Sequence, residues 1–175
     1  KELLCLDLVN FVSNENQQLQ PIVLGSILNA CQLLKHRFEC EKSVGNKDKN
    51  RLIETALMYL NTPFLWGGKT PFGIDCSGFT QMVYRLCGFQ LKRDASEQAK
   101  QGDALSFIEE SSPGDLAFFD NDQGAIIHVG IIMENNHIIH AHGKVRIDRL
   151  DQTGIYNANR RVHSHKLRVI KSIIK

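Results

Sequence analysis

Several features that would place a protein in a specialised class are absent from this sequence. None of the apolar runs among its 175 residues approaches the length that spans a bilayer, so no transmembrane segment is expected. The formal net charge is only +2, and no basic stripe with interleaved aromatic residues occurs, which argues against nucleic acid as a partner. The first ten residues are too short and too charged for a signal peptide. With 42% hydrophobic residues, the chain can form one domain, or one domain with a small appendage.

Paired cysteine motifs are also missing. The five cysteines are an odd number, and no Cys-x-x-Cys pair occurs among them. A disulfide scaffold and a cysteine zinc site are therefore not expected. A single cysteine is most often a small buried hydrophobe, so a catalytic role for any one of them needs support from its neighbours in the sequence.

Turn residues and apolar spacing divide the chain into a first part with short strands and a second part with helices. Leu3 to Val44 contains short apolar runs broken by Asn, Pro and Gly, a pattern typical of strands and turns. The polar stretch from Gly45 to Asn50 is interpreted as a linker. Apolar residues then recur at helical spacing from about Lys47 to Asn61, and a second helix is predicted over Cys76–Leu86.

The last third of the chain is predicted to form strands. Pro113 and Gly114 introduce them, after a polar stretch from Asp94 to Ser112. Because helices come first and strands follow, the expected fold class is α+β and not an alternation of strands and helices. The strands are expected at residues 115–120, 126–133, 137–142, 145–149 and 167–174.

Cys76 differs from the other cysteines in its predicted position. It directly follows Asp75, a residue type suited to the N-cap, so it falls in the first turn of a helix. Unpaired backbone N–H groups and the helix dipole favour negative charge there, so we expect a lowered pKa for the Cys76 thiol. Its own backbone N–H could stabilise the oxyanion that forms when a carbonyl is attacked. Cys87, at the other end of the helix, is predicted to be structural.

Two of the seven histidines lie in neighbouring apolar runs. His128 interrupts the first run and His140 the second. A two-residue turn between the strands would put them on opposite faces. A three-residue loop over Glu134–Asn136 would put Met133 opposite His137, and His128 and His140 diagonally on one face. We predict the three-residue loop, because Asn tolerates positive φ.

A nucleophile at a helix start and two histidines on adjacent strands would suit acyl transfer. In such a site the base, His128, takes the thiol proton of Cys76, and His140 fixes the tautomer of the base. The sequence alone does not show that these elements meet. His163 and His165 stand in a basic, polar stretch and are expected to be solvated.

Six short pieces of the sequence stand in a recognisable order and spacing. They are Pro63–Gly68, Gly73–Phe79, Arg93–Ser96, Pro113–Phe119, His128–Ile131 and Ile139–Ala141. Together they resemble the NlpC/p-sixty family of bacterial cell-wall cysteine peptidases. The resemblance runs from about Lys47 to Ile170.

The resemblance implies a papain-like α+β fold, in which the thiol begins a central helix packed on an antiparallel sheet. It implies hydrolysis of peptidoglycan stem peptides or muropeptides, typically between γ-D-glutamate and a diamino acid, with no cofactor and no metal. Cys76 would be the nucleophile, His128 the base and His140 the residue that orients the base. Peptidoglycan as the substrate suggests the cell envelope, and a cytoplasmic role in muropeptide recycling stays open. The residues implied for the substrate cleft are Phe64, Trp66, Asp75, Ser77 and Ser96.

Residues 1–45 resemble part of a bacterial SH3-like barrel, and residues 46–175 form the peptidase-like domain. At this length the barrel would be incomplete, so the chain is expected to begin inside a longer protein. In relatives with such barrels, the barrel narrows the cleft and favours peptides with a free N-terminal L-alanine.

Two positions depart from the family pattern. Phe64 stands where the family often has Tyr, so a hydroxyl that would assist at the oxyanion or the substrate is missing. His142 stands where a small residue is usual, and it is a rival to His140 for the orienting role.

Three rival functions stay open on the sequence. A zinc site could use His128, His140 and His142, although strand alternation removes His137 from the set. The chain could be a wall-binding module that keeps the fold but has no catalytic activity, and Phe64 is the feature that favours this alternative. A related thiol amidase or acyltransferase would use the same nucleophile on another acyl donor. The third stem residue, diaminopimelate or lysine, is not determined by the sequence.

Overall fold

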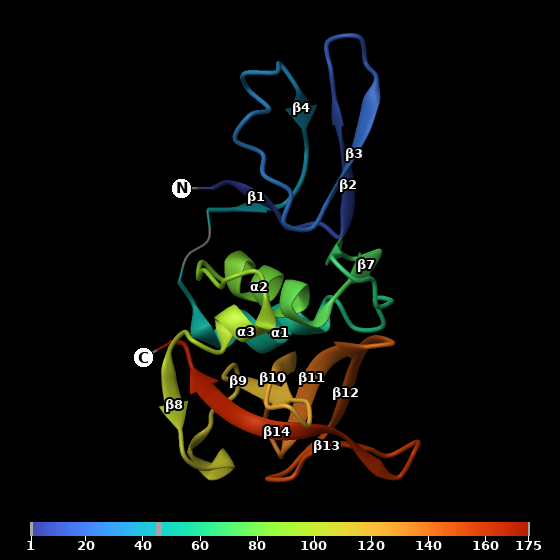
Figure 1. Ribbon diagram of the computed structural model, residues 1–175. Helices are drawn as coiled ribbons and strands as arrows, with labels where there is room; N and C mark the ends of the chain where they lie inside the picture. The colour runs from blue at the N-terminus through green and yellow to red at the C-terminus, as the bar shows by residue number, and fades with distance from the viewer. Residues whose placement is uncertain (1, 45–46, 175) are drawn as a thin grey trace.

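The computed structural model describes residues 2–44 and 47–174, so the predicted domain boundary at residues 45 and 46 lies outside the described residues. Strands come first, three short α-helices follow, and a second set of strands ends the chain (Figure 1). The expected α+β class, with helices preceding the main sheet, is confirmed.

The N-terminal segment forms two small antiparallel sheets. Strand β1 (Leu4–Cys5) pairs with β5 (Lys42–Ser43), while β2 (Val9–Ser13) lies between β3 (Leu19–Val23) and β4 (Arg37–Phe38). The assignment of this segment as an SH3-like barrel stays a prediction. Its own core consists of Cys5, Val12, Leu28 and Cys31.

The first helical region is shorter than its sequence pattern predicted. A 3₁₀ turn η1 (Lys49–Arg51) leads into α1 (Leu52–Leu57), and the chain then leaves the helix in turns that end with Asn61 at φ 70°. A short hairpin of β6 (Lys69–Thr70) and β7 (Gly73–Ile74) follows.

Helix α2 (Cys76–Leu86) has the predicted bounds and caps. The Asp75 side chain accepts a hydrogen bond from the Gly78 backbone N–H at 2.6 Å, so Asp75 is the N-cap. Gly88 takes φ 82° just beyond the helix end, a backbone conformation in which a Cβ is disfavoured. A third helix, α3 (Ala95–Gln98), lies in the stretch that was expected to be merely polar.

The second set of strands closes on itself, which the sequence did not predict. Because β13 pairs with both β12 and β14, the strands β9 to β14 form a closed antiparallel ring, and β8 extends it beside β14. The 3₁₀ turn η2 (Ile108–Glu110) connects β8 to β9. The strands are β8 (Asp103–Leu105), β9 (Leu116–Asp120), β10 (Ile126–Met133), β11 (His137–His142), β12 (Lys144–Leu150), β13 (Gly154–Asn157) and β14 (Val162–Ser172).

Two sequence expectations for this region were wrong. Strand β13 was not expected, and β14 begins at Val162 instead of Leu167. The first residues of β14 are exposed or half-buried, so they lack the apolar alternation that marks a strand in a sequence. Ladder pairing to β13 and β9 holds them extended instead.

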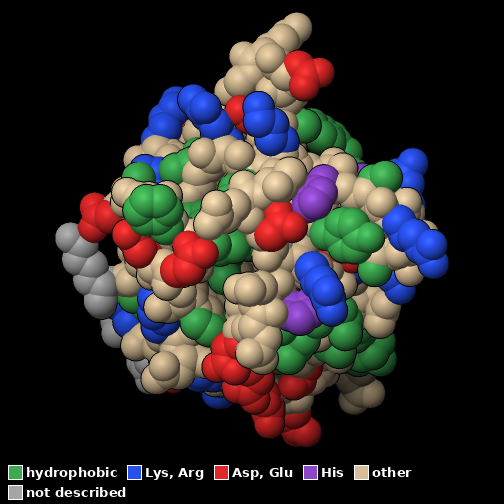
Figure 2. Space-filling view, turned by 90° about the horizontal axis from the view of Figure 1, so that it is seen from below, with side chains coloured by type: hydrophobic (Ala, Val, Ile, Leu, Met, Phe, Trp, Pro, Cys, Tyr) green, Lys and Arg blue, Asp and Glu red, His purple; other side chains and the backbone are tan. Residues whose placement is uncertain are grey.

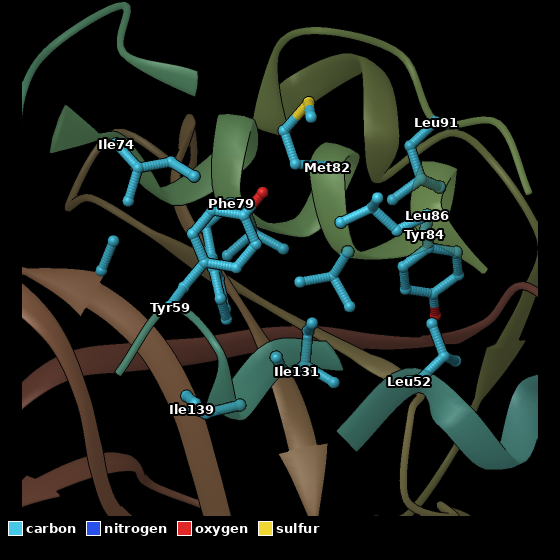
Figure 3. Close-up of a cluster of buried hydrophobic side chains, with 14 of the residues drawn as sticks. Leu52, Tyr59, Ile74, Phe79, Met82, Tyr84, Leu86, Leu91, Ile131 and Ile139 are labelled. Atoms are coloured by element: carbon cyan, nitrogen blue, oxygen red, sulfur yellow. The ribbon is translucent and has the colours of Figure 1, made fainter. Parts of the chain in front are cut away.

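The helices cover one outer face of the barrel. Helix α2 contributes Phe79, Met82 and Val83 to a core shared with Ile131 and Ile139 of the barrel strands (Figure 3). A second core fills the barrel interior. It contains Ala117, Phe119, Ile132, Ile138, Leu150, Ile155 and Ile170.

The N-terminal segment is packed on α2. Leu4 and Leu24 belong to the same core as the helix. Met82 Cε lies 2.2 Å from the place of a Cβ at Gly25, and the backbone there takes φ 80°, a conformation that favours glycine. Glu2 and Arg85 form an ion pair at 2.7 Å beside this contact.

Charged and apolar side chains are mixed on the face of the molecule seen from the barrel side (Figure 2). Seen from the barrel side, lysine and arginine side chains are scattered among apolar and acidic ones, and acidic side chains gather at one edge (Figure 2). Within residues 2–44 and 47–174, none of the helices has the length and apolar character needed to cross a bilayer.

Candidate active site

Cys76 lies at the start of α2 and is half-buried. Burial raises the pKa of its thiol, and the Asp75 carboxylate adds to that effect, while backbone N–H groups of Val129, Ser77 and Cys76 itself lower it. Burial wins, so the pKa is raised. Our expectation of a lowered pKa was wrong in direction, because the sequence shows the helix start but not the burial. The thiol is held at the Val129 amide, next to His128 in the chain.

A clamp of polar groups holds the start of α2. Arg93 donates to both carboxylate oxygens of Asp75, at 3.0 and 2.5 Å, and to Ser77 Oγ at 3.0 Å. The same carboxylate accepts from the Gly67 and Gly78 backbone N–H groups. Burial would raise the pKa of Asp75, but these hydrogen bonds hold it below its usual value. Asp75 therefore stays ionised and fixes the loop before the nucleophile to the helix.

The hairpin of β10 and β11 has the predicted register. Met133 lies opposite His137, so the loop has three residues, and both Asn135 and Asn136 take positive φ, at 56° and 57°. His128 and His140 are then diagonal neighbours on one face. Nε2 of His128 lies 2.8 Å from Nδ1 of His140, and both rings are buried. The expectation that the two histidines meet is confirmed.

Asp148 of β12 extends this pair, and the sequence analysis missed it. Nε2 of His140 lies 3.0 Å from Asp148 Oδ2, and Arg146 Nη2 donates to Oδ1 at 2.8 Å. Burial would raise the pKa of Asp148, yet hydrogen bonds from His140 and Arg146 keep it below its usual value. Strand β12 was predicted, and its polar residues alternate, but only the pairing of β12 with β11 brings Asp148 to His140.

The ionised carboxylate determines which nitrogen of each neutral imidazole carries the proton. A carboxylate only accepts, so His140 donates from Nε2 and its Nδ1 is an acceptor. His128 must then donate from Nε2 to His140. The lone pair of neutral His128 therefore lies on Nδ1, where it is available to take a proton.

The hydrogen-bonded chain Asp148–His140–His128 is called the relay below, and both of its histidines are neutral near pH 7. Burial lowers the pKa of His128 well below its ordinary value, and the nearby His140, His165 and His142 act in the same direction. Burial also lowers the pKa of His140, although its hydrogen bond to Asp148 opposes the shift. The chain from Asp148 to His128 thus carries one negative charge and two neutral rings.

Two further histidines border the relay, and one contradicts our expectation. The ring centroid of His142 lies 6.4 Å from that of His128, and His142 is exposed. His140, not His142, makes the hydrogen bond to His128. His165 was expected to be solvated, but its ring is half-buried and stacks on His128 at 4.2 Å and 26°. His163 is exposed as predicted and bonds Asp151 at 2.8 Å.

The residues predicted to line a substrate cleft divide into two groups. Asp75 and Ser77 are buried and bonded within the clamp, whereas Phe64, Trp66 and Ser96 are exposed. Trp66 is 86% exposed and so is free to contact a ligand. A depression of about 870 Å³ lies elsewhere, between η1, α1 and the β10–β11 loop, and Cys76 does not line it. Contact with substrate stays a prediction for all five residues.

Metal ligands do not gather at the histidines. Across the described residues, the one group of His, Cys, Asp and Glu ligand atoms lying within 4.8 Å of one another is Cys5, Asp7 and Cys40. This group is in the N-terminal segment, away from Cys76. The described groups around His128 are therefore hydrogen-bond donors and acceptors, and the thiol of Cys76 is held at the neighbouring Val129 amide.

Comparison with known proteins gives one family for the chain. The model of the NlpC/P60 family matches residues 61–164, which include Cys76, the histidine relay and Asp148. A curated relative, γ-D-glutamyl-L-lysine dipeptidyl-peptidase of Bacillus subtilis, is 38% identical over 92 residues, covering 51% of this chain and 31% of that protein. The chain thus spans about a third of the length of this relative.

Solved structures agree on the fold. An NlpC/P60 family protein from Bacillus cereus superposes with a TM-score of 0.78 at 21% identity, covering 99% of this chain and 63% of that chain. RipD of Mycobacterium tuberculosis, a non-catalytic NlpC/p60 domain protein, has a TM-score of 0.56 at 18% identity, covering 72% of this chain and 97% of that chain. Both likenesses concern the fold alone.

Proposed function

This chain belongs to the NlpC/P60 family, and on that premise we propose that it is a cysteine endopeptidase that cleaves peptidoglycan stem peptides. The proposed bond joins γ-D-glutamate to the diamino acid. The fold is proposed to be papain-like, with α2 as the central helix that carries the nucleophile. We also propose the cell envelope as the place of action, since the substrate is found there.

One observation carries the proposal: a protonated thiol is held at the backbone N–H of Val129, the residue next to His128, whose free lone pair is fixed by the relay. Burial keeps the Cys76 pKa raised and the His128 pKa lowered, so neither group is charged at rest. The Asp148–His140–His128 hydrogen bonds leave Nδ1 of His128 as the acceptor. These are the requirements for a general base that activates a nucleophile during attack.

The proposed reaction begins when Cys76 Sγ attacks the γ-glutamyl carbonyl while Nδ1 of His128 takes the thiol proton. Backbone N–H groups at the start of α2 stabilise the oxyanion. The imidazolium then gives its proton to the leaving amine, and an acyl-enzyme remains on Cys76. Water, deprotonated by His128, releases the acid and restores the thiol. The relay spreads the transient positive charge toward Asp148, and no cofactor is needed.

The proposed substrate follows from the family and from the curated relative. That relative's name specifies a γ-D-glutamyl-L-lysine bond. For this chain, lysine and diaminopimelate at the third position are both compatible with the proposal. An SH3-like N-terminal segment packed on α2 would narrow the cleft and favour a free N-terminal L-alanine.

The test is incubation with L-Ala-γ-D-Glu-diaminopimelate, its lysine counterpart and the N-acetylmuramoyl form of each, followed by mass spectrometry. Release of the free diamino acid by the wild type, and its loss in Cys76→Ala, would support both reaction and nucleophile. Cys87→Ala is the matched control, because Cys87 lies at the other end of the same helix and contacts Thr55. Release by Cys76→Ala at the wild-type rate would refute the proposed nucleophile.

A second candidate is a wall-binding module without activity. The observation in its favour is Phe64, which cannot supply the hydroxyl that the family often has at this position. A non-catalytic protein with this fold is known in RipD. Folded protein that binds purified peptidoglycan but cleaves none of the peptides would favour this function. A product in which the glutamyl group is moved to another amine would instead indicate a transferase.

A further inference from the structure

A fourth histidine, His165, lies against the ring of the proposed base. Its ring centroid is 4.2 Å from that of His128, with 26° between the planes, so the two rings are stacked. Phe119 lies near both rings, tilted against His128 at 5.8 Å and edge-on to His165 at 5.9 Å between centroids. The hydrogen bond to His140 fixes one nitrogen of His128 but leaves the ring free to swing about that bond. Stacking removes this freedom.

The fold holds His165 in place by backbone contacts. His165 lies opposite Ile155 in the β13–β14 ladder, next to a register shift. At Gly154 the backbone takes φ 147°, and a Cβ there would lie 1.8 Å from the His165 carbonyl oxygen. A glycine is therefore required for β13 to approach β14 this closely. Ser164 Oγ lies 2.8 Å from His165 Nδ1, which sets the direction of the ring.

His165 is neutral at the pH values where the base works. Burial, together with the nearby His140 and His142, lowers the pKa of His165 to about 4, although Asp148 acts in the opposite direction. A neutral ring can stack on the imidazolium that His128 becomes during the reaction, whereas a charged ring would repel it. His165 also covers one face of His128 and so excludes water from it.

We propose that His165 is a positioning residue for His128: its neutral ring fixes the plane of the His128 ring and excludes water from the face on which it stacks. The role rests on the proposed function of His128 as the base. His165 itself does not touch the reacting atoms in this proposal. Its effect on the reaction passes through the orientation and solvation of His128.

The test compares His165→Ala, His165→Phe and the control His163→Ala. His163 lies two residues earlier in β14, is exposed and bonds Asp151, so its loss should leave the relay intact. With the stem peptide as substrate, His165→Ala is expected to lower kcat about tenfold with KM little changed, because the base is misplaced. The acid limb of kcat/KM should move to higher pH, because water that reaches His128 stabilises its charged form and so raises its pKa.

His165→Phe separates stacking from chemistry at the His165 nitrogens. Phe keeps an aromatic face and excludes water, so kcat should stay within about threefold of the wild type. Thermal unfolding shows whether each variant is folded. If folded His165→Ala matches His163→Ala in kcat and in its pH profile, the proposal is overturned. If folded His165→Phe is as impaired as His165→Ala, the stacking role is also overturned.

A second measurement keeps this inference separate from the proposed function. NMR titration of the His128 ring can be made in a Cys76→Ala background, where no turnover is needed. His165→Ala should raise the pKa of His128, whereas His163→Ala should leave it unchanged. An unchanged titration would refute the inference even for an active enzyme. A raised pKa with an inactive wild type would support the stacking and reject only the peptidase.

Discussion

Replacement of Asp148 by Asn tests the relay most directly. The change keeps the size of the side chain and removes its charge. Arg146 Nη2 donates to Asp148 Oδ1, and Arg146 Nε lies 2.6 Å from Oδ2. His140 also donates to Oδ2. A single amide oxygen cannot serve both donors as the carboxylate does. The wild-type tautomer of His140 loses its preference, and the transient imidazolium loses its counter-charge.

The size of the effect follows from the position of the charge. Two unit charges about 4 Å apart attract by about 4 kcal/mol at an effective dielectric constant of about 20, and the energy is inversely proportional to the distance between them. The positive charge of protonated His128 is spread over its ring, and one further imidazole ring, that of His140, separates it from Asp148. About half of that energy, about 2 kcal/mol, is then at stake, which corresponds to about a 30-fold loss of kcat/KM.

The assay is steady-state hydrolysis of the stem peptide near pH 7, with thermal unfolding to show that each variant is folded. Asp151→Asn is the matched control, because Asp151 also pairs with a histidine, His163, but at the surface. It should keep wild-type activity. Asp148→Asn with kcat/KM within about threefold of the wild type would refute the relay, since the charge would then not stabilise the base.

Three further predictions concern the substrate side, stability and packing. Phe64→Tyr should raise kcat up to about tenfold if the missing hydroxyl assists the oxyanion, and an unchanged kcat would assign that role elsewhere. His128 and His140 have lowered pKa values in the folded chain but ordinary ones when unfolded, so only the unfolded chain takes up protons below about pH 6.5. The free energy of unfolding should then fall by up to about 1.4 kcal/mol per histidine for each pH unit, and a urea midpoint that is flat from pH 6.5 to 5 would contradict this. Among the described residues, the buried Tyr59 hydroxyl has no hydrogen-bond partner, whereas the Tyr84 hydroxyl donates to a backbone carbonyl. In urea unfolding, Tyr84→Phe should therefore lower the free energy of unfolding by about 1 kcal/mol, and Tyr59→Phe should leave it unchanged or raise it.

Local patterns were enough to predict the elements that carry Cys76, His128 and His140, the proposed catalytic residues. Helix α2 begins at Cys76 because Asp75 is its N-cap, and Gly88 with positive φ lies just beyond its end, so both bounds follow from the local sequence. The register that joins His128 to His140 also follows from a local feature, the positive φ that two consecutive asparagines accept. Capping and turn chemistry act over a few residues, which is why the sequence displays them.

The partners of these groups come from distant strands, and only the tertiary structure determines them. Asp148 reaches His140 through the β11–β12 ladder, and His165 reaches His128 because the barrel closes through β13 and β14. Neither residue has a neighbour in sequence that marks its role. His165 even stands in a polar stretch that suggested solvent, since ladder hydrogen bonds and not apolar spacing hold it there.

The pKa of the Cys76 thiol also depends partly on local sequence and partly on the tertiary structure. From the sequence, the position of Cys76 at a helix start predicts a lowered pKa, and the backbone N–H groups do act in that direction. The packing of the helix start against β10 buries the thiol, and desolvation outweighs those N–H groups. The sequence by itself determined which residues are candidates for the chemistry, because side-chain type and helix capping are local properties. Burial depends on surfaces brought together from the whole chain, so the tertiary structure alone decided their protonation and their partners.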